Sequence, residues 1–152
     1  MISLAKLLST LFGIGYMEKG AGTVAALITA LLLYLGLSRG VSFWVLPVVS
    51  LLTFFVGVWA SGLVEPIWGH DSNKVVIDEV LGMCVALLLV PVTLQTVAFA
   101  LLLFRIFDIA KPLFIRRAEA LPGGWGVMTD DLLAGIYANV VLHVLLKAIK
   151  LN

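Results

Sequence analysis

Two adjacent pairs of acidic residues are the side chains best suited to chemistry in this sequence. Asp78-Glu79 opens the apolar stretch DEVLGMCVALL, and Asp130-Asp131 opens LLAGIYANVVL in the same way. One such pair is explained by helix stability alone, because acids in a first turn favour the helix dipole. Two pairs brought together would repel each other unless a cation neutralised them, and Mg²⁺ prefers such oxygen ligands. A magnesium site and two ordinary helix starts are therefore the competing interpretations.

A second charged group follows one of the apolar stretches. Arg105, Asp108 and Lys111 repeat every three residues, which places them on roughly one face of a helix. The two bases suit a phosphate group, and the acid suits a metal ion or the orientation of a base. A solvated ladder of ion pairs is the alternative. Arg116-Arg117 would contact either a specific lipid head group or anionic lipids in general.

Three weaker signals accompany these groups. Gly22-Thr23 lies at the start of an apolar helix, where a backbone without a side chain can approach an anion, so we expect it to bind phosphate. A plain turn is the alternative. His70 is either a proton donor to a leaving group or an interfacial polar residue. Asn139 and His143 lie four residues apart in the last apolar segment and predict a hydrogen bond between helices.

The elements that must position these residues are mostly apolar. The chain has 152 residues, of which 62% are hydrophobic and 12% charged, and its mean hydropathy is +1.14. A soluble domain is about half apolar and about a quarter charged. We therefore expect one integral membrane domain over residues 1–152. A net charge of +1 without a basic stripe argues against nucleic acid as a partner.

The apolar segments predict an all-α membrane bundle with short and re-entrant helices. Residues 1–16 have the pattern of an amphipathic helix at the membrane surface. Apolar segments follow at residues 24–35, 41–64, 80–104 and 132–149, and only the first of them is too short to span a bilayer. No alternation of period two is long enough for a barrel.

The segment 80–104 decides whether the charged groups can meet. A straight helix would hold the loops 65–79 and 105–131 about 37 Å apart, on opposite sides of the membrane. Pro91 interrupts the segment, and proline disrupts a helix interior. We expect the chain to turn back there as two short helices, which brings both loops to one face. A continuous kinked helix is the alternative.

Taken together, these motifs resemble the phosphatidylglycerophosphatase A family of bacterial membrane lipid phosphatases. The resemblance covers nearly the whole chain. It rests on Gly22-Thr23, D-E-x-x-G at 78–82, F-R-x-F-D-I-x-K-P at 104–112 and G-G-x-G-x-x-x-D-D-x-x-A-G at 123–135. The family usually has proline where this chain has Ala21 and Phe114. Neither departure replaces a charged residue, so they affect the shape of two turns more than the chemistry.

The resemblance implies a Mg²⁺-dependent enzyme of phospholipid biosynthesis that hydrolyses phosphatidylglycerophosphate to phosphatidylglycerol and phosphate. The expected Mg²⁺ ligands are Glu79, Asp108, Asp130 and Asp131. Arg105 and Lys111 would bind the phosphate, and Asp78 would accept a proton from the attacking water. The substrate would be an anionic phospholipid of the bacterial inner membrane. Lysines and arginines near these motifs favour a cytoplasmic site.

The sequence leaves other functions open, and it also offers one residue as a control. A phosphatase for another lipid phosphate and a small transporter or channel are the alternatives. A transporter would hold ionisable groups at mid-membrane, whereas these lie at the ends of segments. The sequence leaves the oligomeric state open. Glu119 lies in the same polar stretch but outside the motifs, so we expect its neutralisation to have little effect.

Overall fold

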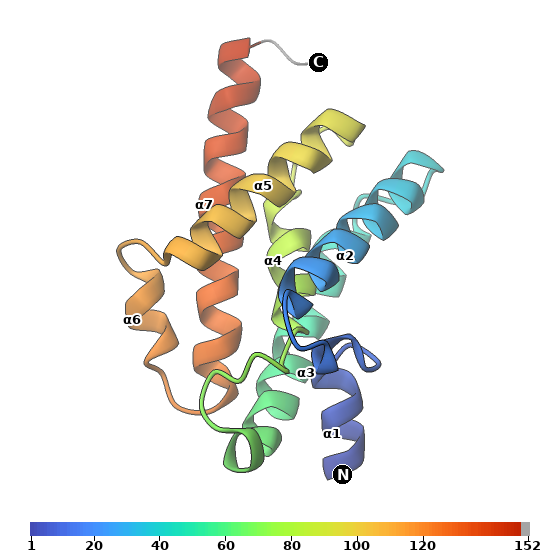
Figure 1. Ribbon diagram of the computed structural model, residues 1–152. Helices are drawn as coiled ribbons and strands as arrows, with labels where there is room; N and C mark the ends of the chain where they lie inside the picture. Colours follow the sequence, from blue (N-terminus) through green and yellow to red (C-terminus); the bar gives the residue numbers. More distant parts are fainter. Residues whose placement is uncertain (150–152) are drawn as a thin grey trace.

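The computed structural model describes residues 1–149, and this part of the chain contains helices and no strand (Figure 1). The predicted all-α membrane bundle is confirmed. The elements are α1 (Ile2–Ser9), the 3₁₀ turn η1 (Ile14–Tyr16), α2 (Ala21–Ser38), α3 (Val45–Trp68), α4 (Asp78–Ala86), α5 (Leu94–Ala110), α6 (Ile115–Glu119) and α7 (Gly124–Ile149).

Three helices, α2, α3 and α7, are long and apolar enough to cross a membrane. Each exposes large apolar side chains, such as Leu31, Leu52 and Val144, which suits contact with lipid. The segment at 24–35 was expected to be too short to span. It belongs to an 18-residue helix, because α2 begins at Ala21 and continues to Ser38.

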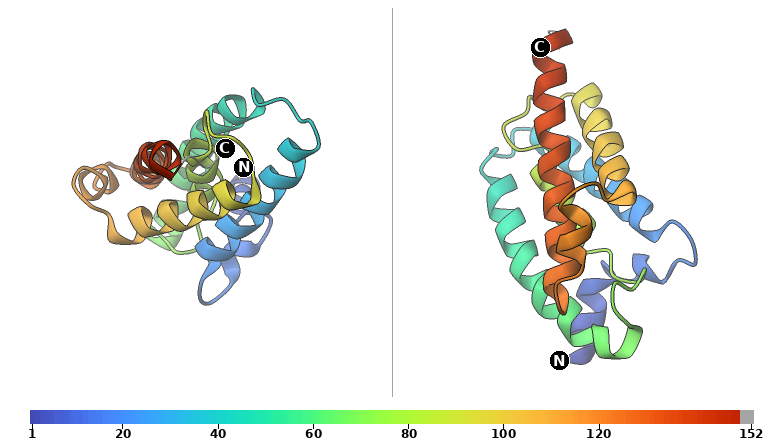
Figure 2. Two further views of the ribbon diagram at one scale, coloured as in Figure 1. Left: turned by 90° about the horizontal axis from the view of Figure 1, so that it is seen from above. Right: turned by 90° about the vertical axis from the view of Figure 1, so that its left-hand side faces the viewer.

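The short helix α4 lies in the interior of the bundle, in contact with α2, α3, α5 and α7 (Figures 1 and 2). Its apolar side chains, among them Leu81, Met83 and Cys84, are almost fully buried. A helix that is apolar on all sides is expected in such a position. The acidic residues that open α4 are therefore fixed by the packing of the whole bundle.

The chain reverses after α4, and the expected break at Pro91 is confirmed. Residues 87–93 form the turn, and Thr93 caps α5 by accepting a hydrogen bond from the Thr96 backbone N–H at 3.2 Å. Asn139 of α7 donates to the carbonyl oxygens of Ala86 (3.1 Å) and Leu88 (2.7 Å). The predicted interhelical role of this side chain is also confirmed.

His143 supports the same turn one helical turn further along α7. Its Nε2 lies 3.1 Å from the carbonyl oxygen of Leu89. Backbone groups in an apolar bundle need internal partners, because lipid offers none. Polar side chains of α7 thus satisfy the carbonyls that the end of α4 leaves open.

Helices α4 and α7 pack against each other at two glycines, Gly82 and Gly135. A Cβ atom on Gly135 would lie 2.6 Å from the Gly82 carbonyl oxygen and 3.1 Å from Val85 Cβ. Gly135 therefore requires a residue without a side chain, and a Cβ atom on Gly82 would overlap the ring of Phe104. The two backbones are in direct contact one turn beyond the acidic residues.

Three local expectations were wrong. Helix α7 begins at Gly124, so Asp130 and Asp131 lie in its second turn and the helix-start explanation fails for this pair. Helix α5 ends at Ala110, and Lys111 has a φ of 44°, so it does not continue the helical face of Arg105. The N-terminal helix ends at Ser9, because Leu11 and Phe12 adopt left-handed backbone conformations.

Candidate active site

A polar cavity of about 490 Å³ opens where α2 and α4 begin and α5 ends. The break at Pro91 brings both charged loops to this one end of the bundle. Nine of the predicted site residues line the cavity: Gly22, Thr23, Asp78, Glu79, Arg105, Asp108, Lys111, Asp130 and Asp131.

Arg105 connects three helices at this cavity. Its Nη1 donates to Glu79 Oε1 of α4 at 2.5 Å and to Asp108 Oδ2 at 2.7 Å, and its Nη2 lies 3.4 Å from Thr23 Oγ1 of α2. A side chain at Gly22 would overlap the Glu79 carboxylate. Glycine at this position lets the first turn of α2 pack directly against the ion pair.

Lys111 is the centre of a second cluster. Its Nζ lies 2.8 Å from Asp130 Oδ2, 3.1 Å from Glu119 Oε1 and 3.5 Å from Asp71 Oδ2. Sequence reasoning missed the contacts of Asp71 and Glu119 with Lys111; Glu119 lies outside the motifs, as stated, but it pairs with a residue of the site. No periodicity points to these contacts, because the left-handed backbone of Lys111 aims its side chain away from the α5 face. The only hint was that Asp71 belongs to the acidic loop 65–79.

Two buried carboxylate oxygens in the cavity wall have no hydrogen-bond partner: Glu79 Oε2 and Asp131 Oδ2. The other carboxylate of each acidic pair is partly satisfied by backbone, since Asp78 Oδ1 accepts from the Glu79 N–H and Asp130 Oδ1 from the Asp131 N–H. Leaving a buried polar group unpaired costs about 1–3 kcal/mol, and more for a charged one. The two open oxygens therefore indicate a place for a ligand.

The excess of acidic side chains around the cavity also favours a bound cation. Seven acidic and three basic side chains line it. A phosphate monoester would be repelled by this excess of negative charge. A bound cation would remove the repulsion and would satisfy the two open oxygens.

No three His, Cys, Asp or Glu side chains within residues 1–149 are arranged as a ready-made metal site. Three of the predicted ligands are engaged in ion pairs, Glu79 and Asp108 with Arg105 and Asp130 with Lys111. Mg²⁺ usually binds through one or two carboxylates, several waters and a substrate phosphate. The open oxygens of Glu79 and Asp131 fit that demand, and a four-carboxylate shell is not preformed.

Burial alters the acidity of the carboxyls that open α4. It raises the pKa of Glu79 to about 7, although Arg105 opposes the shift. Burial, followed by repulsion from Glu79, also raises the pKa of Asp78 well above its usual range. Both carboxyls therefore lose their protons less readily than exposed ones, and a further positive charge nearby would favour their ionised forms.

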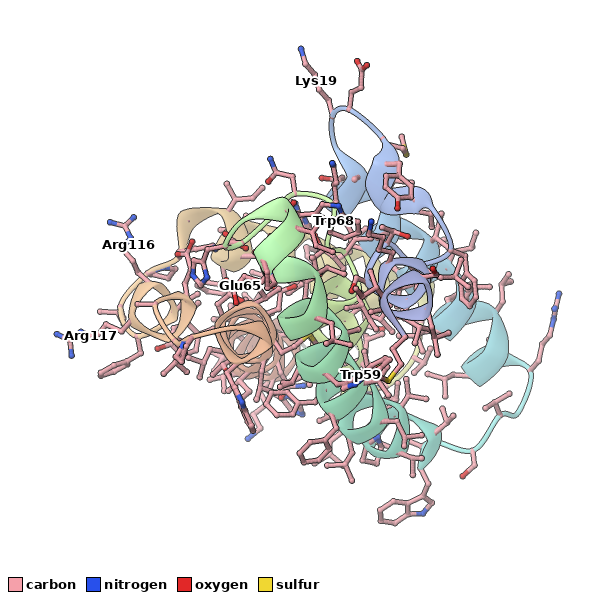
Figure 3. The ribbon with its side chains drawn as sticks, turned by 90° about the horizontal axis from the view of Figure 1, so that it is seen from below. Lys19, Trp59, Glu65, Trp68, Arg116 and Arg117 are labelled. Carbon is pink, nitrogen blue, oxygen red and sulfur yellow. The ribbon has the colours of Figure 1, made fainter. Side chains whose placement is uncertain are left out.

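Two predicted residues lie apart from the cavity. Arg116 and Arg117 of α6 are exposed and point away from the bundle (Figure 3), and Arg117 lies over the ring of Phe114 at 5.8 Å. The structure does not bring them to the cavity, so contact with lipid head groups stays a prediction.

His70 also lies outside the cavity lining. Its Nδ1 is 2.5 Å from Glu65 Oε1, and its Nε2 donates to the Glu119 carbonyl oxygen at 3.1 Å. The hydrogen bond with Glu65 raises the pKa of His70. These contacts favour a structural role between α3 and α6 over proton donation to a leaving group.

The motifs and the cavity agree with the comparison to known families. The family model described as phosphatidylglycerophosphatase A matches residues 7–146. The chain belongs to this family. It is accordingly a phosphatase in a helical membrane bundle.

Three relatives illustrate the range of the phosphatidylglycerophosphatase A family. A Bacteroides thetaiotaomicron protein, provisionally named as a phosphatidylinositol-3-phosphatase, is 40% identical over 147 residues, which cover 93% of this chain and 92% of the relative. Phosphatidylglycerophosphatase A of Haemophilus influenzae is 36% identical over 140 residues, covering 90% and 85%. The Escherichia coli protein of that name is 38% identical over 76 residues, covering 49% and 44%. No solved structure matches the chain.

Proposed function

We propose that this protein is a Mg²⁺-dependent phosphatase that hydrolyses phosphatidylglycerophosphate to phosphatidylglycerol and phosphate. One observation carries the metal dependence: the buried Glu79 Oε2 and Asp131 Oδ2 lack partners in the wall of a cavity that also holds Arg105 and Lys111. The family supports the substrate, and the apolar surfaces of α2, α3 and α7 support a lipid environment.

The metal site in this proposal uses four carboxylates. The residues that would hold Mg²⁺ are Glu79, Asp108, Asp130 and Asp131. A bound Mg²⁺ supplies Lewis acidity, which polarises phosphoryl oxygens and lowers the pKa of a water. Asp78 would accept the proton of the attacking water, because it lines the same cavity and its raised pKa makes its ionised form a stronger base.

The basic residues have to exchange partners during this reaction. Arg105 and Lys111 are held by carboxylates in the structure. Once these carboxylates are neutralised, the guanidinium and the ammonium can turn to the phosphoryl oxygens and offset their charge in the transition state. The backbone N–H groups of Gly22 and Thr23, at the start of α2, supply further donors for the phosphate.

We also propose that the protein lies in the bacterial inner membrane with the cavity facing the cytoplasm. Lysines gather at the cavity end of the bundle: Lys19 and Lys111 line the cavity, and Lys6 and Lys74 both lie over the Trp68 ring. Positive residues next to membrane-spanning helices are more frequent on the cytoplasmic side.

A second substrate is supported by one comparison. The relative with 40% identity is provisionally named as a phosphatidylinositol-3-phosphatase. Both lipids present a phosphate monoester on an anionic head group, so the same cavity chemistry applies to each. We place phosphatidylglycerophosphate first, because the family model and two of the relatives carry that name.

The deciding experiment measures phosphate release by the purified protein from each lipid, with Mg²⁺ and with excess EDTA. We expect phosphatidylglycerophosphate to give the higher kcat/KM, EDTA to abolish release, and added Mg²⁺ to restore it. Full activity in EDTA would end the metal proposal. A higher kcat/KM for phosphatidylinositol 3-phosphate would reverse the order of the two substrates.

A further inference from the structure

An exposed apolar surface continues directly from the rim of the cavity. Ile109 lines the cavity and is 72% exposed. Leu102, which is 56% exposed, lies two turns earlier on the same side of α5, and Ile106 is exposed beside it. On α2, Thr23 lines the cavity, and the exposed Leu27 follows one turn later on the same side.

The two helices that carry these residues lie together. Helices α2 and α5 contact each other, and Figure 2 shows both leading away from the cavity end of the bundle. Small buried residues, Ala26 and Ala30 of α2 and Ala100 of α5, belong to one core cluster. The Arg105–Thr23 contact joins the helices where the apolar residues reach the cavity. We define the α2–α5 surface as Leu27, Leu31, Leu102, Ile106 and Ile109.

Other parts of the rim differ from this surface. The segments 17–20 and 71–73 contribute the charged or polar residues Glu18, Lys19, Asp71, Ser72 and Asn73, together with Gly20 and one large apolar side chain, Met17. A lipid whose phosphate lies in the cavity must still keep its acyl chains among apolar groups, since each exposed CH₂ costs about 0.8 kcal/mol. The α2–α5 surface offers such groups in continuity with the cavity, through Ile109.

We propose that the acyl chains of the lipid phosphate lie along the α2–α5 surface while the phosphate occupies the cavity, so that the substrate enters sideways from the membrane past Ile109. The inference rests on the proposed function, because it takes a lipid phosphate as the substrate. It makes Ile109 and Leu102 determinants of preference for the acylated substrate, without a part in the chemistry.

The test compares two substrates that share one head group. The first is phosphatidylglycerophosphate in mixed micelles, and the second is its water-soluble deacylated form. The variants are Ile109→Asn and Leu102→Asn. The matched control is Leu52→Asn on α3, because Leu52 is 61% exposed and does not line the cavity.

We expect Ile109→Asn to lower kcat/KM for the lipid about tenfold and Leu102→Asn to lower it severalfold, since each loses apolar contact with the chains. Leu102→Asn should change kcat/KM for the deacylated form by no more than about twofold, and Ile109→Asn, which alters a cavity-lining residue, should lower it less than it lowers the value for the lipid. Where the deacylated form is bound but not hydrolysed, its inhibition constant replaces kcat/KM. Leu52→Asn should leave both values unchanged.

The outcomes separate the two proposals. Equal losses on both substrates, no loss at all, or an equal loss in Leu52→Asn would overturn the lateral route and leave the phosphatase intact. A wild-type protein that hydrolyses no lipid phosphate would instead refute the proposed function. Leu102→Asn guards against a damaged cavity, because Leu102 lies two turns from Ile109 and does not line the cavity.

Discussion

The polar atoms at the two ends of α4 differ in whether they have hydrogen-bond partners. At its C-terminal end, Asn139 and His143 of α7 contact the carbonyl oxygens that the turn leaves open. At its N-terminal end, Glu79 Oε2 and the neighbouring Asp131 Oδ2 have no partner. The same helix, α7, supplies side chains to both ends. Around α4, the side chains from α7 at one end hold a turn, and the two open carboxylate oxygens at the other end lie in residues that line the cavity.

The largest expected effect is on catalysis, from a substitution beside the N-terminal end of α4. Asp131→Asn keeps the size of the side chain but removes the charge proposed to hold Mg²⁺. We expect kcat to fall on the order of 10²-fold or more, as loss of transition-state charge stabilisation typically does. The measurement is kcat at equal amounts of folded protein, with Tm as the check on folding.

Glu65→Gln provides the control for this substitution. Glu65 pairs with His70 and does not line the cavity, so the same loss of charge there should leave kcat nearly normal. Near-normal turnover in Asp131→Asn, or an equal loss in Glu65→Gln, would show that the unpartnered oxygen has no role in catalysis.

At the C-terminal end of α4, loss of the hydrogen bonds should lower the stability of the fold and leave activity nearly unchanged. Asn139→Leu removes the donors to Ala86 O and Leu88 O, and we expect it to lower the free energy of unfolding by about 1–3 kcal/mol. The kcat of the protein that remains folded should be close to wild type. Thermal unfolding and kinetics on the same sample check both statements. A large fall in kcat with an unchanged Tm would contradict the distinction between the two ends.

Lys111 lies between these extremes, because it is partnered in the structure and proposed to bind phosphate. Lys111→Ala should raise KM roughly tenfold and also lower kcat, since phosphate is bound in both ground and transition states. Glu119→Gln should have a smaller effect, because Asp130 and Asp71 still contact Lys111. A steady-state comparison of the two variants tests this order, and a larger effect of Glu119→Gln would reverse the assignment.

The smallest expected effect concerns the pair His70–Glu65, which lies near the cavity but does not line it. The pKa of His70 is raised by its hydrogen bond with Glu65, so protonated His70 stabilises the fold. This stabilisation is fully present below the usual His pKa of about 6.5 and is lost as pH rises through the folded value. Tm measured against pH should therefore fall slightly more over this range in wild type than in His70→Asn. Parallel curves would contradict a structural role.

Local patterns in the sequence predicted the broken segment and the membrane bundle well. Pro91 marks the turn because proline removes a backbone donor and disfavours a helix interior, although Pro66 is accommodated in the last turn of α3. The start of α7 could not be predicted in this way. Asp130 and Asp131 look like residues before a helix, although they are buried in its second turn. Hydropathy does not distinguish a loop from a helix face that lines a polar cavity.

The sequence predicted which residues line the candidate site, but it did not predict which of their side chains form ion pairs. The motifs named nine residues that line one cavity. The contacts of Lys111 with Asp71 and Glu119 depend on one left-handed backbone angle and on the course of two loops. Such contacts join residues far apart in the chain, and the spacing of residue types carries no signal for them.

The contact between Gly82 and Gly135 has a consequence for ion size. Gly82 lies three residues after Glu79 and Gly135 lies four residues after Asp131, so about one helical turn separates the contact from each carboxylate. Because no side chain separates the two backbones at this contact, it limits how far apart the two acidic side chains can lie. Mg²⁺ needs oxygen distances of about 2.0–2.1 Å, whereas Ca²⁺ accepts about 2.3–2.6 Å. If the carboxylates hold Mg²⁺ as proposed, an added methyl group at Gly135 would widen the gap and shift selectivity toward the larger ion.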